Sequence, residues 1–245
     1  LREKHIMTVK TITLPFRYDQ VGRLLRSSNL TEAREQYKTG AITQDQLINV
    51  ENNEIIRLIE KQKENGVLAI TDGEFRRSWW HFDFLGGLDG VEYYEKDKGL
   101  DFHQMETRKE GIRVIGKIGF TTHPFVQHFE FLKQHAGEVV VKQTIPSPNM
   151  LIRRVDMNDE VYQDKEEFKQ DIIVAYQKAI QAFYDAGCRY LQLDDTAWAD
   201  LFSAEGHEKL RAKGLDPAEE LVLMQQMINE SIAKKPEDLA VTMHI

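Results

Sequence analysis

The hydrophobic positions of this chain alternate between helix-like and strand-like spacing. Between residues 43 and 65, apolar side chains recur at roughly helical intervals, and Thr43 followed by Gln46 resembles a capping box. Gly66 is a typical helix stop, and the apolar run after it predicts a strand over 67–71. The first half of the chain therefore contains at least one helix followed directly by a strand.

The same alternation continues in the second half. Apolar residues on one helical face predict a helix over about 164–186, which Gly187 would end. Asp216 and Pro217 mark the start of another helix, as a cap followed by proline in the first turn. We expect residues 1–30 to be irregular and to form a lead-in strand and loop, and residues 85–110 to form an excursion before the next strand. Further strands are predicted over 112–120, 138–145, 189–194 and 239–245.

This order of elements predicts an α/β domain. The connections between strands are long enough for parallel pairing, which favours a barrel or a doubly wound sheet. We expect one domain over 1–245 of the TIM (β/α)8 type. The last predicted strand stops in mid-element at Ile245, so we expect the barrel to be incomplete: with five or six strand units present, two or three would lie beyond it. The mass of the natural gene product tests this expectation.

Composition narrows the class of partner. A hydrophobic content of 41% is sufficient for a substantial core, and the net charge of −8 argues against a nucleic-acid surface. The single cysteine, Cys188, excludes an internal disulfide framework. No apolar run approaches membrane-spanning length, and the start of the chain lacks a secretory pattern. We therefore expect a cytoplasmic protein with a small-molecule partner, no nucleic acid and no membrane.

Acidic residues follow two of the predicted strands. Glu74 comes just after strand 67–71, and Asp194 with Asp195 ends strand 189–194. In α/β barrels the C-terminal strand ends form the active site, so either group could bind a cation. The alternatives are that Glu74 pairs with neighbouring arginines on a solvated loop and that the two aspartates only cap the next helix. Adjacent strand residues point in opposite directions, and we assign Asp194 to the site, while the other acid either caps or pairs.

Two other features near strand ends have both a structural and a functional interpretation. His244 lies at the end of the last strand and is either a structural histidine or a metal ligand. The aromatic run from Trp79 to Phe82 follows the Glu74 loop and forms either a pocket wall or part of the core. The other histidines, including His103, lack ligand-like spacing and are expected to be surface or packing residues.

Several of these stretches together resemble the cobalamin-independent methionine synthase family, in particular its catalytic C-terminal barrel and its shorter single-barrel relatives. The resemblance spans most of the chain. It rests on GVLAITDGEFR, LGGLDGV, AGCRYLQLDDTAW and the closing Thr-Met-His, which occupy 66–76, 85–91, 186–198 and 242–244. It implies a zinc-dependent enzyme, without cobalamin, that moves a methyl group from a methyltetrahydrofolate-type donor to the thiol of homocysteine, giving methionine. Zinc lowers the pKa of a bound thiol and so favours the reactive thiolate.

The resemblance also implies roles for individual residues. Glu74 and Asp194 match the two acids that hold the amino group of homocysteine, and His244 matches the histidine of the family's H-x-C zinc motif. The cysteine of that motif would lie one residue beyond Ile245, and two further ligands farther on. One imidazole does not hold zinc firmly, so residues 1–245 alone are expected to be metal-poor and inactive.

The chain departs from the family pattern at two places. Where relatives have Val-Gly-Ser, it has Arg23 after Val21-Gly22, and this arginine either binds the substrate carboxylate or points outward. Where the long enzymes place an aromatic residue for the pterin, it has Leu151-Ile152-Arg153, which leaves a different methyl donor open. Two other functions also stay open: a decarboxylase resembling uroporphyrinogen decarboxylase, and a non-catalytic amino-acid-binding barrel.

Overall fold

A curved parallel sheet forms the centre of the molecule. The computed structural model describes residues 14, 16, 19–95, 101–102, 105–106 and 110–245. Within them the sheet has the order β1-β6-β8-β9, and all of its pairings are parallel. Its strands are β1 (Ala69–Ile70), β6 (Val140–Pro146), β8 (Tyr190–Asp194) and β9 (Ala240–His244). The two central strands are buried along almost their whole length, as is typical of parallel sheets covered by helices.

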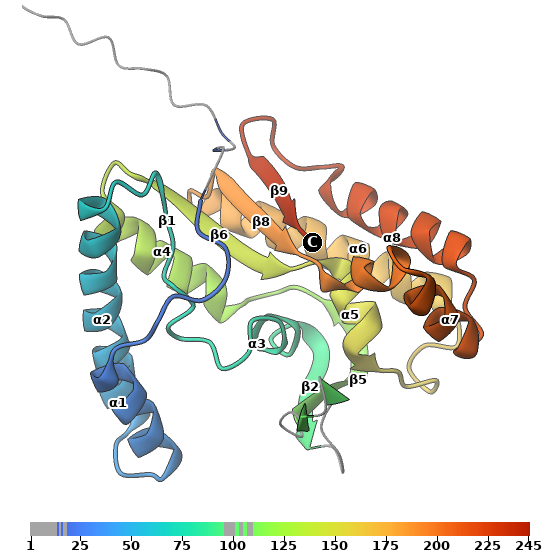
Figure 1. Cartoon of the computed structure of the whole chain (residues 1–245), viewed down its shortest axis with the longest axis horizontal. Helices are drawn as coiled ribbons and strands as arrows, with labels where there is room; N and C mark the ends of the chain where they lie inside the picture. The colour runs from blue at the N-terminus through green and yellow to red at the C-terminus, as the bar shows by residue number, and fades with distance from the viewer. Residues whose placement is uncertain (1–13, 15, 17–18, 96–100, 103–104, 107–109) are drawn as a thin grey trace, which may run out of the picture.

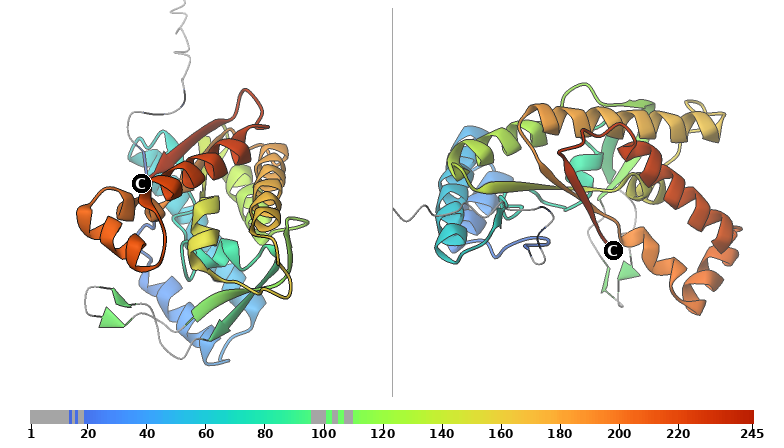
Figure 2. Two further views of the ribbon diagram at one scale, coloured as in Figure 1. Left: turned by 90° about the vertical axis from the view of Figure 1, so that its right-hand side faces the viewer. Right: turned by 90° about the horizontal axis from the view of Figure 1, so that it is seen from above.

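Four long helices cover the outer side of this sheet (Figures 1 and 2). They are α2 (Gln44–Glu64), α4 (Pro124–Ala136), α6 (Lys165–Asp185) and α8 (Pro217–Ile232). The predicted capping box of Thr43 and the Asp216–Pro217 start are both present. Apolar helix residues such as Ile55 and Phe183 join strand residues such as Leu191 in one hydrophobic core. The predicted helices 43–65 and 164–186 are thus confirmed to within about two residues.

A second, smaller sheet corrects one prediction. Strand β5 (Glu110–Gly119) lies where we predicted 112–120, but it pairs antiparallel with β2 (Asp89–Glu95) and parallel with β7 (Val155–Asp156), outside the central sheet. Strands close in sequence pair antiparallel more readily, because a parallel neighbour needs a long crossover. The described residues therefore hold four strands of the parallel sheet, and the 112–120 segment is not one of them. Much of the expected lead-in lies outside the described residues, so the number of strand units stays a prediction.

Several short elements complete the described chain. Near the end of the expected lead-in, a helix that was not predicted begins: α1 (Ser28–Lys38), which Ser27 caps. Only Leu30 and Ala33 of α1 are buried, so its apolar periodicity is weak. Part of the expected lead-in and of the 85–110 excursion, with His103, lies outside the described residues. The other elements are α3 (Phe82–Leu85), the pair β3 (Asp101–Phe102) and β4 (Met105–Glu106), α5 (Pro148–Arg154), the 3-10 helix η1 (Thr196–Leu201) and α7 (Ala204–Ala212).

The register of the central sheet brings the candidate residues together. Asp194 pairs with Pro146 of β6 on one side and with His244 of β9 on the other. The C-terminal ends of three parallel strands therefore lie side by side, and the loop after β1 lies beside them (Figure 1). No helix in the described part of the chain is long and apolar enough to cross a membrane.

Candidate active site

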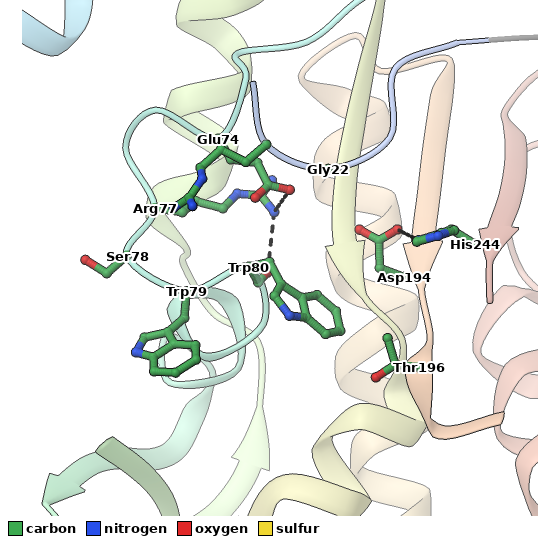
Figure 3. Close-up of a pocket in the computed structure, with 10 residues that line it drawn as sticks. Gly22, Glu74, Arg77, Ser78, Trp79, Trp80, Asp194, Thr196 and His244 are labelled. Carbon is green, nitrogen blue, oxygen red and sulfur yellow. Dashed lines mark hydrogen bonds and ion pairs between the residues drawn. The ribbon is translucent and has the colours of Figure 1, made fainter. Parts of the chain in front are cut away.

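A cavity of about 500 Å³ opens at this edge of the sheet. Its volume is within the usual range for small-molecule sites. The loop after β1, the ends of β8 and β9, and the segment before α1 all contribute to it (Figure 3). It is lined by Gly22, Arg23, Glu74, Arg77, Ser78, Trp79, Trp80, Asp194, Thr196 and His244. All four residues that the sequence assigned to substrate or metal therefore line the same cavity.

The loop after β1 holds Glu74 in an unusual backbone conformation. Its φ of 57° lies in the left-handed region, and the preceding Gly73 has a φ of 65°. The Glu74 N–H donates to Oδ1 of Asp72 at 2.9 Å, and the Gly73 N–H donates to Oγ1 of Thr71 at 3.2 Å. Such a conformation is costly for a residue with a side chain, and residues held in it cluster at functional sites. The strain is consistent with a loop shaped to place this carboxylate.

The Glu74 carboxylate is buried and only weakly compensated. The residue is 6% exposed, and its Oε1 has no hydrogen-bond partner. Nη1 of Arg77 lies 3.7 Å from Oε1, which is a long ion pair. Burial raises the pKa of Glu74, the nearby charge of Asp194 raises it further, and Arg77 offsets only part of this. A carboxylate in this state would be stabilised by a cationic ligand.

The loop is buried rather than solvated, although the expected pairing of Glu74 with Arg77 is present as a long contact. Arg77 is 4% exposed and donates from Nη2 to the backbone oxygen of Thr144 at 2.6 Å and to its Oγ1 at 3.1 Å. Its guanidinium also lies over the Phe125 ring, 4.6 Å from the centroid. Arg76 pairs with Glu51 at 3.3 Å. Sequence reasoning treated Arg77 as a surface partner, because nothing local reveals that it contacts β6.

The two adjacent aspartates have different roles. Asp195 accepts from the Ala197 N–H, from Nε1 of Trp198 at 2.9 Å and from Nδ2 of Asn149 at 2.8 Å, so it caps η1 and anchors the neighbouring segments. Asp194 points the other way, into the cavity (Figure 3). This is the division expected from strand geometry.

Asp194 connects the cavity to His244. Its Oδ1 accepts from Nε2 of Gln192 at 2.6 Å and lies 3.3 Å from Nδ1 of His244. Its other oxygen faces the Glu74 side of the cavity (Figure 3). Burial raises the pKa of Asp194, and the contacts with Gln192 and His244 lower it in part. The site therefore contains two buried carboxylates that are close enough to influence each other.

His244 has the surroundings of a metal-ligating imidazole but lacks the other ligands. A carboxylate on one ring nitrogen is the usual way to orient a ligating histidine, and the His244 side chain is 47% exposed. However, the described residues contain no group of three or more His, Cys, Asp or Glu side chains that could hold a metal ion. Structural zinc sites take four ligands, and His244 is the one imidazole among the described residues that line this cavity.

Of the other residues considered in the sequence, Arg23 lines the cavity, whereas Arg153, Cys188 and His123 do not. Arg23 lines the rim and is exposed, and its charge lowers the pKa of Glu74 slightly. Arg153 does not line the cavity, because its Nη2 bonds Oε2 of Glu220 at 2.9 Å. Cys188 is fully buried and burial raises its pKa to about 11, as expected for a packing thiol. His123 is buried too, and caps α4.

Comparison with known proteins identifies the family. Residues 20–242 match the family described as "Cobalamin-independent synthase, Catalytic domain". The chain belongs to the cobalamin-independent methionine synthase family. The match includes the lining residues from Gly22 to Thr196 and ends two residues before His244, so the resemblance inferred from short motifs is confirmed over most of the chain.

The relatives include both an uncharacterized protein and a methionine synthase. The chain is 53% identical to the uncharacterized protein YxjG of Bacillus subtilis over 94% of its own length and 61% of that protein's. It is 24% identical to a methionine synthase of Saccharolobus solfataricus over 72% of its length and 52% of that protein's. The chain thus spans about three fifths of the length of the Bacillus relative.

Solved structures confirm the TIM-barrel fold class. A crystal structure from Listeria monocytogenes, described as a candidate vitamin-B12-independent methionine synthase, has a TM-score of 0.80 and 48% identity, covering 94% of this chain and 65% of that one. A B12-independent methionine synthase from Shewanella sp. W3-18-1, solved with selenomethionine, has a TM-score of 0.62 and 16% identity over 83% of this chain and 53% of its own. In the described part of this chain the barrel is open, with β1 and β9 at its edges.

Proposed function

We propose that the full-length protein transfers a methyl group from a methyltetrahydrofolate-type donor to the thiol of homocysteine, giving methionine. The observation that carries the proposal is the pair of buried, undercompensated carboxylates, Glu74 and Asp194, facing one cavity beside His244. Membership of the cobalamin-independent methionine synthase family supports it. A protein of the same fold has been solved with selenomethionine, the selenium form of the proposed product.

The two carboxylates suit the ammonium group of an amino acid. Each is at most 6% exposed, and each has its pKa raised mainly by burial. An ammonium placed between them would donate hydrogen bonds to both and cancel their mutual repulsion. Arg23 lines the same cavity, where it can pair with the carboxylate that the amino acid carries on the same carbon as its ammonium. In this arrangement the thiol side chain is directed toward His244, beside Asp194.

His244 is the proposed zinc ligand, with the other donors supplied by the rest of the full-length protein. Bound zinc would hold the homocysteine sulfur as a thiolate. The contribution of this chain is to orient the imidazole through Asp194, 3.3 Å away, and to align the amino acid with the donor. The sulfur–carbon bond then forms as the bond between the methyl carbon and the donor nitrogen breaks, and that nitrogen takes up a proton.

The acidic character of the cavity argues against the decarboxylase alternative. A porphyrinogen-type substrate carries several carboxylates and needs several available arginines. Among the described lining residues, Arg77 is committed to Thr144 and Glu74, which leaves Arg23 facing two acids. The direct test is methionine formation from homocysteine and 5-methyltetrahydrofolate by the full-length protein. Failure with zinc supplied would remove the proposed function and favour the amino-acid-binding barrel.

Replacing Glu74 with glutamine is expected to weaken homocysteine binding by about 1–3 kcal/mol, because a charged acceptor for the ammonium is lost while the shape is kept. Titration calorimetry on the full-length protein measures this directly. Glu64→Gln, at the exposed end of α2, is the matched control and should leave the dissociation constant unchanged. An equal constant in Glu74→Gln and wild type would remove Glu74 from the binding site.

On acidification, homocysteine affinity is also expected to fall at a higher pH than it would if Glu74 and Asp194 had ordinary carboxyl pKa values. Only the ionised carboxylates attract the ammonium, and burial raises the pKa values of Glu74 and Asp194 above the usual 4.5 and 3.8. As the pH drops through these raised values, protonation removes the attraction, so the dissociation constant rises. Calorimetry across a pH series checks this. A dissociation constant that stays flat down to the ordinary carboxyl range contradicts it.

A further inference from the structure

The cavity has a second half that the amino acid does not use. Glu74, Asp194 and His244 occupy one part, and Trp79, Trp80 and Thr196 line the other (Figure 3). At about 500 Å³ the cavity is larger than homocysteine requires and lies within the range of sites that bind drug-sized ligands. The second half therefore has room for the methyl donor.

The segment that would be expected to stack the donor ring does not reach this cavity. Leu151 is fully buried in the hydrophobic core, and Arg153 pairs with Glu220. Neither residue lines the cavity, and neither offers an aromatic face. A flat ring that enters the second half must therefore find its stacking partner on another element.

Trp80 offers such a face. Figure 3 shows its indole extending from the β1 loop into the space between Glu74 and Thr196, whereas the Trp79 indole is directed away from Asp194. Nε1 of Trp79 donates to a carboxylate oxygen of Glu110, which holds that ring to β5. The Trp80 side chain is half-buried, so part of its surface is open to the cavity.

The ring of Trp80 is also held in place by two neighbouring rings, those of His81 and Phe82. His81 stacks on it with the centroids 4.6 Å apart and the planes 21° apart, and Phe82 stacks on His81 at 4.1 Å and 18°. Burial lowers the pKa of His81 to about 3, so the middle ring is uncharged at neutral pH. Three stacked rings form a rigid support, and such preorganisation lowers the entropic cost of binding a flat ligand.

We propose that the Trp80 indole is the surface on which the flat ring of the methyl donor stacks, in place of an aromatic residue at 151–153. This rests on the proposed function for the identity of the donor, a reduced pterin. Trp80 then determines donor specificity, and Glu74 with Asp194 determines amino-acid specificity. Stacking on Trp80 places the donor beside the site of the thiol, as direct methyl transfer requires.

The test compares Trp80→Leu with Trp80→Phe in the full-length protein. Losing the aromatic face should raise the KM for 5-methyltetrahydrofolate about tenfold or more, and phenylalanine should restore most of it. The KM for homocysteine should change less than about threefold, because the acidic half is untouched. A donor KM that is unchanged in Trp80→Leu, or that rises together with the homocysteine KM, would overturn the assignment.

Equilibrium binding separates this inference from the proposed function. Calorimetry with 5-methyltetrahydrofolate, and with 5-methyltetrahydropterin, which lacks the tail, should show the same loss of affinity in Trp80→Leu. If wild type binds both through Trp80 but forms no methionine, the stacking site stands and the proposed reaction fails. If wild type forms methionine and Trp80→Leu binds both probes normally, the reaction stands and the stacking site fails. Absence of any binding of the two probes by wild type overturns the stacking site.

Discussion

Replacing His244 with alanine in the full-length protein is expected to lower zinc affinity more than about 100-fold and to abolish measurable methyl transfer. Removal of a ligand costs more than removal of the residues that orient it, which typically cost 10–100-fold. His244 is the only imidazole that lines the cavity in the described chain, and Asp194 orients it. Elemental analysis gives the zinc content, and X-ray absorption identifies nitrogen and sulfur neighbours.

The control for this change is His135→Ala. His135 lies on α4, away from the cavity, and its ring nitrogen bonds the backbone oxygen of Phe131 at 2.8 Å. Zinc content and activity should stay at the wild-type level in this variant. Wild-type zinc content in His244→Ala would mean that the metal, if present, is held elsewhere, and the zinc role of His244 would then be wrong.

Replacing Arg77 with methionine is expected to lower the free energy of unfolding by about 3–5 kcal/mol, because it removes one partner of a buried charge cluster. The change leaves the Glu74 carboxylate without its neighbouring cation and removes one of the two side-chain donors to the Thr144 backbone oxygen, the other being Nε2 of Gln143. It also removes the guanidinium from the Phe125 ring. Urea unfolding followed by circular dichroism measures the difference.

Two further variants test the cause of this loss. Arg57→Met removes an exposed arginine that pairs with Glu54, and it should cost less than about 1 kcal/mol. Adding Glu74→Gln to Arg77→Met should recover part of the lost stability, because the uncompensated charge is removed with its partner. Strictly additive costs in the double variant would show that the two residues are not coupled.

Local sequence signals were sufficient to predict three of the four long helices, α2, α6 and α8, whereas α4 was not predicted. The capping box at Thr43 and the proline after Asp216 define where α2 and α8 begin, since these signals act within a few residues. Helix α1 escaped prediction because it buries only Leu30 and Ala33, so its stability depends on packing against α2. The strand after residue 110 was predicted, but its pairing partner was not, because pairing is decided by segments distant in sequence.

The amino-acid sequence by itself determined the family, three of the four long helices, the main strands, and the candidates Glu74, Asp194, Arg23 and His244. Tertiary structure decided that these residues share one cavity, that Arg77 is buried against β6, and that Trp80 has a face open to the cavity. The physical reason is the distance along the chain over which each kind of signal acts. Caps and periodicity depend on neighbours along the chain, whereas burial, charge compensation and pKa shifts depend on which strands and loops meet in space.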